Sequence, residues 1–161
     1  MRLVIADTGP INYLILIGHI DILPALFERV ILPNVVRDEL FSCKAPSAVR
    51  AWIASIPDWI EVATVSGTDD AALQDIDLGE RAAIRLAAAL HADLLLMDDR
   101  KGVRAAEQKG LRVTGTLGVL DLAADRGLLD FAQAVQKLQR TNFRQPQALL
   151  EMLQEKHTKE K

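Results

Sequence analysis

The sequence is poor in the residues that build disulfide frameworks and zinc sites. Cys43 is the only cysteine among 161 residues, which excludes an internal disulfide. The three histidines, His19, His91 and His157, stand far apart without the spacing of zinc ligands. Aromatic residues make up only 4% of the chain, so the apolar residues are mainly Ala, Leu, Ile and Val. This composition suits helices packed on a buried parallel sheet.

Long apolar runs and a strong net charge are also missing. Residues 10–23 are rich in Ile and Leu but include Asn12, His19 and Asp21, so they fall short of the about 20 apolar residues that span a bilayer. We therefore expect no membrane segment and, without a secretory pattern after Met1, a cytoplasmic location. A net charge of −3 gives no general attraction to phosphate backbones. Any nucleic-acid contact needs a local cluster of Arg and Lys.

Short apolar runs alternate with helical patterns along the chain, which predicts an α/β fold with a central parallel sheet. The polar stretch 66–77 is expected to be a loop with one helical turn at most. We predict one domain over residues 1–140, followed by a C-terminal helical extension and frayed tail over 141–161. The predicted strands cover residues 3–6, 30–32, 59–65, 93–97 and 111–114. The predicted helices cover residues 11–18, 21–28, 34–41, 47–55, 79–91, 101–109, 117–126, 130–139 and 145–155.

Two of the predicted strands end on acidic residues. Asp7 follows the run 3–6, and Asp98 and Asp99 follow the run 94–97. Ligands of open α/β sheets bind beyond the carboxyl ends of the strands, so these acids are expected to lie near one another. A local alternative exists for each: Asp7 would form an Asx turn or cap the next helix, and one of Asp98 and Asp99 would cap the helix from Lys101.

Helical geometry adds two acids that face inward. In the helix from Asn34, Glu39 falls on the side of Val36, whereas Asp38 falls on the outward side. In the helix 79–91, Glu80 lies at the centre of an apolar stripe. The alternatives are a surface role for Glu39 and, for Glu80, a favourable interaction with the helix dipole.

Four segments carry these acids: Val-Ile-Ala-Asp7-Thr-Gly-Pro-Ile, Leu-Pro-Asn-Val-Val-Arg-Asp-Glu39-Leu, Asp77-Leu-Gly-Glu80-Arg-Ala-Ala-Ile and Leu-Leu-Leu-Met-Asp98-Asp99-Arg-Lys-Gly. With them, and with the closing Val-Thr-Gly-Thr116-Leu-Gly-Val-Leu, roughly residues 1–130 resemble PIN-domain proteins. These proteins are metal-dependent nucleases that include the toxins of many bacterial and archaeal toxin–antitoxin pairs. The resemblance implies a three-layer α/β/α sandwich that hydrolyses RNA phosphodiester bonds.

The resemblance also assigns the metal site. It implies that Asp7, Glu39, Glu80 and Asp98 are catalytic and hold the metal, with Asp99 as a companion or replacement for Asp98. It implies a small antitoxin as partner and a homodimer. Many toxin members carry Asp where this chain has Glu80. Some members place a further acid after the last strand, where this chain has threonines.

The chemistry of the predicted site favours Mg²⁺ or Mn²⁺, because hard cations take oxygen ligands and no His or Cys stands nearby. Such ions activate water and stabilise charge in phosphodiester hydrolysis. Without a metal, clustered carboxylates repel one another, and at least one is expected to bind a proton near neutral pH. The predicted substrate-positioning residues are Thr8, Arg81, Arg85, Arg100, Lys101, Arg104 and Thr116. For the five basic residues the alternative is a solvated helix face.

Three other interpretations compete with a nuclease. Asp7-Thr8-Gly9 matches the triplet of aspartic proteases, but those are β-rich and this chain is mainly helical. A receiver-like signalling domain also gathers acids at strand ends, but no Lys ends the last predicted strand. A non-catalytic PIN-fold interaction module stays open, because a fold does not imply a function. The sequence contains no Walker loop, G-x-G-x-x-G or G-x-S-x-G motif.

Overall fold

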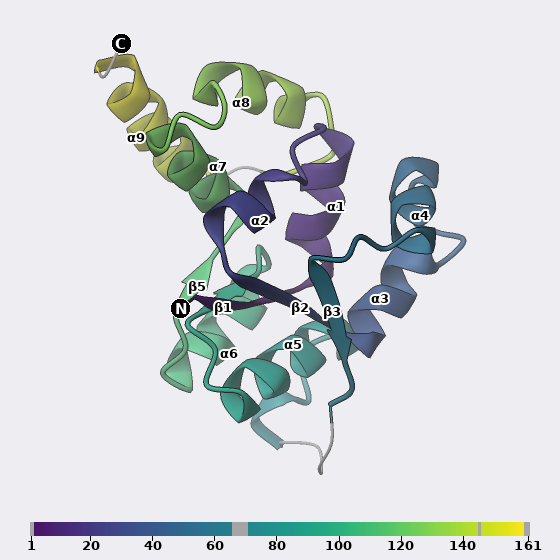
Figure 1. Ribbon diagram of the computed structural model, residues 1–161. Coiled ribbons are helices and arrows are strands. Elements are labelled where there is room, and N and C mark those ends of the chain that lie inside the picture. Colours follow the sequence, from purple (N-terminus) through teal and green to yellow (C-terminus); the bar gives the residue numbers. More distant parts are fainter. Residues whose placement is uncertain (1, 66–70, 145, 160–161) are drawn as a thin grey trace.

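A central parallel sheet organises the fold. The computed structural model describes residues 2–65, 71–144 and 146–159. In these residues five strands, all parallel, form one sheet in the order β3-β2-β1-β4-β5 (Figure 1). The strands are β1 (Leu3–Ala6), β2 (Arg29–Pro33), β3 (Ile60–Ala63), β4 (Leu94–Leu96) and β5 (Val113–Thr114). The predicted α/β fold with a central parallel sheet is confirmed.

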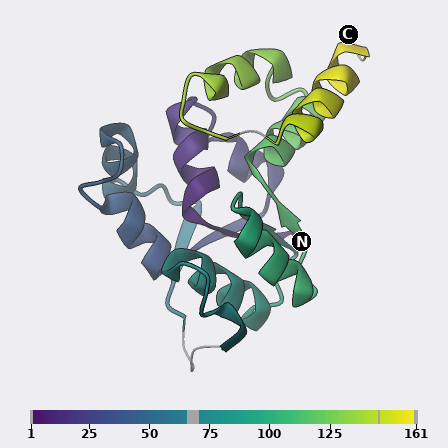
Figure 2. The same cartoon turned by 180° about the vertical axis from the view of Figure 1, so that it is seen from behind.

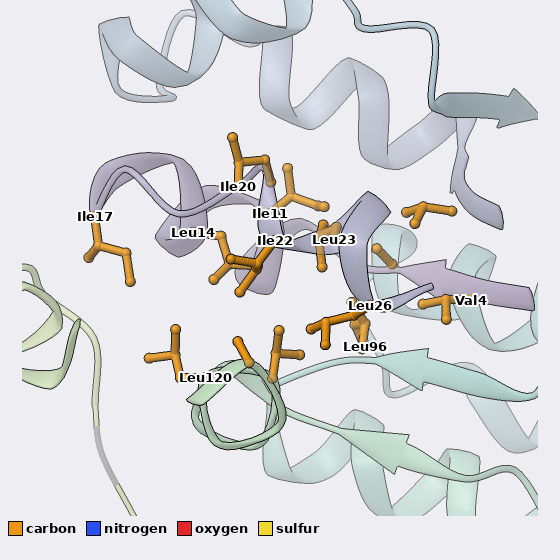
Figure 3. Close-up of a cluster of buried hydrophobic side chains, with 14 of the residues drawn as sticks. Val4, Ile11, Leu14, Ile17, Ile20, Ile22, Leu23, Leu26, Leu96 and Leu120 are labelled. Atoms are coloured by element: carbon orange, nitrogen blue, oxygen red, sulfur yellow. The ribbon is translucent and has the colours of Figure 1, made fainter. Parts of the chain in front are cut away.

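Both faces of the sheet are buried, which explains why its strands are continuous apolar runs instead of alternating ones. Val4 and Leu96 point into a core cluster on one face (Figure 3), whereas Ile5 and Leu95 point into a second cluster on the other. Successive strand residues alternate between faces, so each strand contributes to both clusters.

Helices form the two outer layers (Figures 1 and 2). Helices α5 and α6 cover one face, and α1, α2 and α7 cover the other, with α8 and α9 packed outside α7. The helices are α1 (Thr8–Leu16), α2 (Ile22–Leu26), α3 (Asn34–Phe41), α4 (Ser47–Ala54), α5 (Leu78–Ala89), α6 (Arg100–Gln108), α7 (Thr116–Asp125), α8 (Phe131–Gln139) and α9 (Gln147–Lys159). No helix in the described part of the chain is long and apolar enough to cross a membrane.

The strand order creates a crevice between β1 and β4. From β1 the chain adds β2 and then β3 on one side, and it later adds β4 and β5 on the other. Connections leave the carboxyl ends of β1 and β4 in opposite directions, and in open α/β sheets this switch point is where ligands bind. The amide of Asp7 donates to the carbonyl of Leu96 at 2.9 Å, so the residue after β1 is held beside the end of β4.

Several predicted boundaries differ from the structure. Helix α1 begins at Thr8 instead of residue 11, because Pro10 lies in the first turn, where a helix does not need its N–H. The predicted strand 59–65 is shorter, covering only Ile60–Ala63. Of the predicted loop 66–77, residues 66–70 lie outside the described residues, and Ala71–Leu73 form one 3₁₀ turn.

The end of the chain is more ordered than predicted. The expected frayed tail from His157 is wrong as far as Lys159, because α9 continues through these residues. Lys156 Nζ lies 2.9 Å from Asp121 Oδ1, and His157 Nε2 lies 2.8 Å from the same oxygen. The buried His157 ring also stacks on Phe131 with centroids 4.5 Å apart. These contacts fasten α9 to α7 and α8.

Candidate metal centre

A cavity of about 1070 Å³ opens at the switch point, beyond the carboxyl ends of β1 and β4. We call it the acidic cavity, because its described lining residues include Asp7, Glu39, Asp77, Glu80, Asp98 and Asp99. The structure thus brings together all five acids predicted as metal ligands, from positions as much as 92 residues apart in the sequence. Asp77 is a sixth acid of the cavity, and it was not among the predicted metal ligands.

Asp7 lines the acidic cavity and is only 6% exposed. It occupies the N-cap position of α1, yet its side chain makes no capping hydrogen bond with the described residues. Burial raises the pKa of its carboxyl to about 7, and the charges of Glu39, Asp77 and Asp98 add to this rise. A hydrogen bond from the amide of Thr8 opposes it. The capping alternative therefore does not explain Asp7.

The adjacent acids after β4 have different partners. Asp98 Oδ1 accepts from the amide of Thr116 at 2.7 Å, and Asp98 Oδ2 accepts from Thr116 Oγ1 at 2.6 Å. Burial nevertheless raises the pKa of Asp98, against the effect of these bonds. Asp99 is exposed, and its Oδ1 caps α6 by accepting from the amides of Lys101, at 2.8 Å, and Gly102. Of Asp98 and Asp99, it is therefore Asp99 that caps α6, as the alternative for one of these two acids predicted.

Glu80 and Asp77 form an acidic pair at the start of α5. Asp77 caps this helix, accepting from the amide of Gly79 at 3.0 Å. Glu80, only 8% exposed, has a pKa raised to about 8. The causes are burial, the charges of Asp7, Asp99 and Asp77, and a hydrogen bond with the Asp77 side chain that favours the protonated form. Dipole stabilisation of a charged Glu80 is thus outweighed. Sequence reasoning missed Asp77, although a capping Asp three residues before Glu80 was the available signal.

Glu39 reaches the acidic cavity from α3. Thr8 Oγ1 donates to Glu39 Oε2 at 2.8 Å, which fixes the carboxylate beside the start of α1. Burial and the charge of Asp77 raise the pKa of Glu39, while the bond from Thr8 and one from a backbone amide lower it. Asp38 is exposed and pairs with Arg37 at 3.2 Å, as expected for an outward residue.

Glycines leave the space that these carboxylates occupy. A Cβ atom on Gly115 would lie 2.7 Å from Asp98 Oδ1, and one on Gly102 would lie 2.5 Å from Glu80 Oε2. Ordinary Cβ atoms never approach other atoms so closely. The glycines in such contact with an acid of the cavity are Gly79, Gly102 and Gly115, and a Cβ atom on Gly9 would lie 3.3 Å from Asp98 Oδ2. A side chain at Gly79, Gly102 or Gly115 would therefore force the neighbouring carboxylate to move.

Basic residues also line the acidic cavity. Three predicted substrate-positioning residues lie there, namely Arg100, Lys101 and Arg104. Arg144, which sequence reasoning missed, also lines the cavity. Arg81 and Arg85 are not among its described lining residues. The two predicted threonines lie against acids instead: Thr8 on Glu39 and Thr116 on Asp98.

The segment after α8 forms another wall of the acidic cavity. Asn142, Phe143, Arg144 and Pro146 line it together with Tyr13 of α1. Tyr13 Oη donates to Asn142 Oδ1 at 2.9 Å, and the rings of Tyr13 and Phe143 meet edge to face at 4.9 Å. Residues beyond the predicted domain limit at 140 thus contribute to the site.

The donor set of the acidic cavity fits a hard divalent cation. Its acids offer oxygen atoms, the ligands that Mg²⁺ and Mn²⁺ prefer. The raised pKa values of Asp7 and Glu80 show that these carboxyls resist becoming charged together. A divalent cation would relieve that repulsion.

A second possible metal group lies elsewhere in the described residues. Single ligand atoms of Asp121, Asp125 and His157 lie within 4.8 Å of one another. The ammonium of Lys156 already pairs with both of these aspartates, at 2.9 Å each. This group therefore has a cation of its own, provided by the chain.

Comparison with protein families matches residues 3–159 to a family described as a PIN domain. No curated protein matches this chain. The match covers nearly the whole chain, including α9, and PIN domains are a nuclease-type fold that uses divalent metals. The chain belongs to the PIN-domain family, as the family match over residues 3–159 shows. The parallel sheet and the acids at its switch point are consistent with this assignment.

Proposed function

We propose that this protein is a Mg²⁺- or Mn²⁺-dependent ribonuclease that hydrolyses phosphodiester bonds in the acidic cavity. The observation that carries the proposal is the convergence of Asp7, Asp98 and Glu80 on one cavity at the switch point. Acids this buried weaken the fold when they are charged, so a purely structural role does not account for them.

Asp7, Glu80 and Asp98 are the proposed ligands of the cation, with Glu39 facing them from α3. Asp98 is preferred over Asp99 because Asp99 already caps α6, whereas both hydrogen bonds from Thr116 orient Asp98. A bound cation lowers the pKa of water and stabilises the charge that develops on the phosphate. The raised pKa values of Asp7 and Glu80 mean that a cation binding there near neutral pH would displace protons from these carboxyls.

The substrate backbone would be held by the basic residues that line the cavity. An acidic cavity repels phosphates, so nearby cations must offset that repulsion. The first half of α6 provides Arg100, Lys101 and Arg104. Arg144 lines the same cavity from the C-terminal segment, by which we mean the described residues after α8. RNA as the substrate is supported by the resemblance to toxin ribonucleases.

A toxin role rests on the same resemblance. We propose that a small antitoxin binds over or near the acidic cavity and that the protein forms a homodimer. Inducing the chain in a bacterial host should stop growth, and inducing Asp98→Asn should not. Harmless induction of the wild-type chain would contradict the toxin role and leave the nuclease proposal to its own test.

The nuclease proposal is tested by incubating purified protein with single-stranded RNA and Mg²⁺ or Mn²⁺. We expect cleavage that EDTA abolishes and that Asp7→Asn and Asp98→Asn reduce by about 10²-fold or more, since each removes a proposed ligand. Asp38→Asn is the matched control, because this exposed acid follows Arg37 next to Glu39 but is not among the described lining residues of the cavity. Cleavage unchanged by EDTA and by both substitutions would refute the proposal, and absence of cleavage would favour a non-catalytic interaction module.

A further inference from the structure

A second, smaller cavity adjoins the acidic one. It has a volume of about 170 Å³ and lies between the end of β4, α6, β5, the start of α7 and the C-terminal segment. The two cavities share four lining residues: Asp98, Phe143, Arg144 and Pro146. A molecule bound at the carboxylates could therefore extend directly into this second space, which we call the apolar cavity.

The walls of the apolar cavity are mainly uncharged. Val103 of α6, Leu117 of α7 and Leu149 of α9 face it from three helices, and Met97 closes it beside the sheet. The charged residues among its described lining, Asp98 and Arg144, belong to the boundary that it shares with the acidic cavity. The ligand portion that fits is uncharged and presents an apolar surface to these side chains, whereas its charged portion remains at the boundary.

The size of the apolar cavity limits what enters it. An apolar cavity of about 150 Å³ is known to hold one benzene molecule. A volume of about 170 Å³ is therefore a closer match to one six-membered ring than to the larger fused rings of a purine. The Phe143 ring at the boundary offers an aromatic surface, and nucleobases stack favourably on such surfaces.

We propose that the apolar cavity is a nucleobase subsite that takes a pyrimidine adjacent to the phosphodiester held in the acidic cavity. The inference rests on the proposed nuclease function, and it specifies the substrate: an unpaired pyrimidine in single-stranded RNA. A base in a duplex is stacked and paired, and it cannot enter a pocket without leaving the helix. The C-terminal segment, which supplies Phe143 and Leu149, thus contributes to specificity.

The first test uses nucleosides, which carry no phosphate and need no metal or activity. Uridine, cytidine and adenosine are titrated into wild-type protein while the methyl resonances of Val103, Leu117 and Leu149 are followed by NMR. We expect saturable shifts of these methyls with both pyrimidine nucleosides and about tenfold weaker binding of adenosine. Unshifted methyls, or equal affinity for adenosine, would overturn the inference.

The second test changes the cavity itself. Leu149→Trp should fill it and weaken uridine binding about tenfold, and Leu149→Ala should enlarge it and reduce the preference for uridine over adenosine. Met152→Trp is the matched control, since Met152 is exposed on the same helix and lines neither cavity. Unchanged uridine affinity in Leu149→Trp would contradict the subsite.

The outcomes separate the two proposals. Pyrimidine binding at these methyls without any RNA cleavage would refute the nuclease proposal and support the subsite as a binding site. Metal-dependent cleavage at equal rates for oligouridylate and oligoadenylate, with no methyl shifts, would refute the subsite alone.

Discussion

Asp7→Asn should stabilise the metal-free protein, although it removes a residue that we propose is essential. Burial raises the pKa of Asp7 from 3.8 to about 7, so ionising this carboxyl in the folded protein is unfavourable. Each pKa unit corresponds to about 1.4 kcal/mol, and three units give about 4 kcal/mol. An Asn side chain has nearly the same shape and carries no charge, so the variant avoids this loss.

The sign of the pH dependence follows from the raised pKa. Stability linked to Asp7 is fully present below pH 3.8, the unfolded value, and is lost as the pH rises toward about 7. The advantage of Asp7→Asn should therefore grow by about 1.4 kcal/mol per pH unit between about pH 4 and pH 7 and then level off. A constant offset from packing of the amide would not alter this slope.

The assay is urea denaturation in EDTA, followed by circular dichroism at several pH values between 4 and 9. The control is Asp38→Asn, because the Asp38 side chain is 67% exposed. Its stability difference from wild type should stay within about 0.5 kcal/mol across the range. A stability difference between Asp7→Asn and wild type that does not change with pH would refute the claim that burial holds Asp7 in its protonated form.

The remaining predictions concern residues that position the acids or the C-terminal helix. Thr116→Val removes the 2.6 Å hydrogen bond to Asp98. Metal-dependent cleavage, measured at saturating metal, should fall by about 10- to 100-fold. Unchanged cleavage would exclude a role of Thr116 in positioning Asp98. Gly79→Ala should lower cleavage about tenfold, because the added Cβ would displace the Glu39 carboxylate. The melting temperature should not fall, because Ala favours the helix. A lower melting temperature, large enough to explain the lost cleavage by unfolding, would contradict this prediction. His157→Ala removes a buried stacked ring and should reduce the free energy of unfolding by about 1–3 kcal/mol in urea; no change would show that α9 is not fastened there.

The sequence predicted the parts of the site that depend on local patterns. Asp7 and Asp98 stand at the ends of apolar runs, and Glu39 and Glu80 fall on inward faces of helices, so strand geometry and helical periodicity were sufficient to select them. The same patterns left Asp98 and Asp99 unresolved. The hydrogen bonds from Thr116, 18 residues away, distinguish them in the structure.

The parts that were missed depend on contacts distant in sequence. Arg144 and Phe143 reach the site because Phe143 packs on Tyr13, 130 residues earlier, and no periodic pattern encodes that contact. The helical continuation through His157 likewise depends on Asp121 and Phe131. The predicted start of α1 at residue 11 was too late for a local reason. Pro10 is compatible with the first turn of a helix, so the helix begins before it, at Thr8.

Titrating Mn²⁺ into the protein by calorimetry at pH 8 tests most directly whether the acids at the switch point hold the metal. Wild type, Asp38→Asn and His157→Ala should bind with similar affinity. Asp98→Asn should bind Mn²⁺ at least about tenfold more weakly. A change in a residue that only supports a metal ligand already costs about tenfold in affinity, and Asp98 is a proposed ligand itself. Unweakened binding by Asp98→Asn, together with lost binding by His157→Ala, would place the metal at the Asp121–Asp125–His157 group and contradict the account.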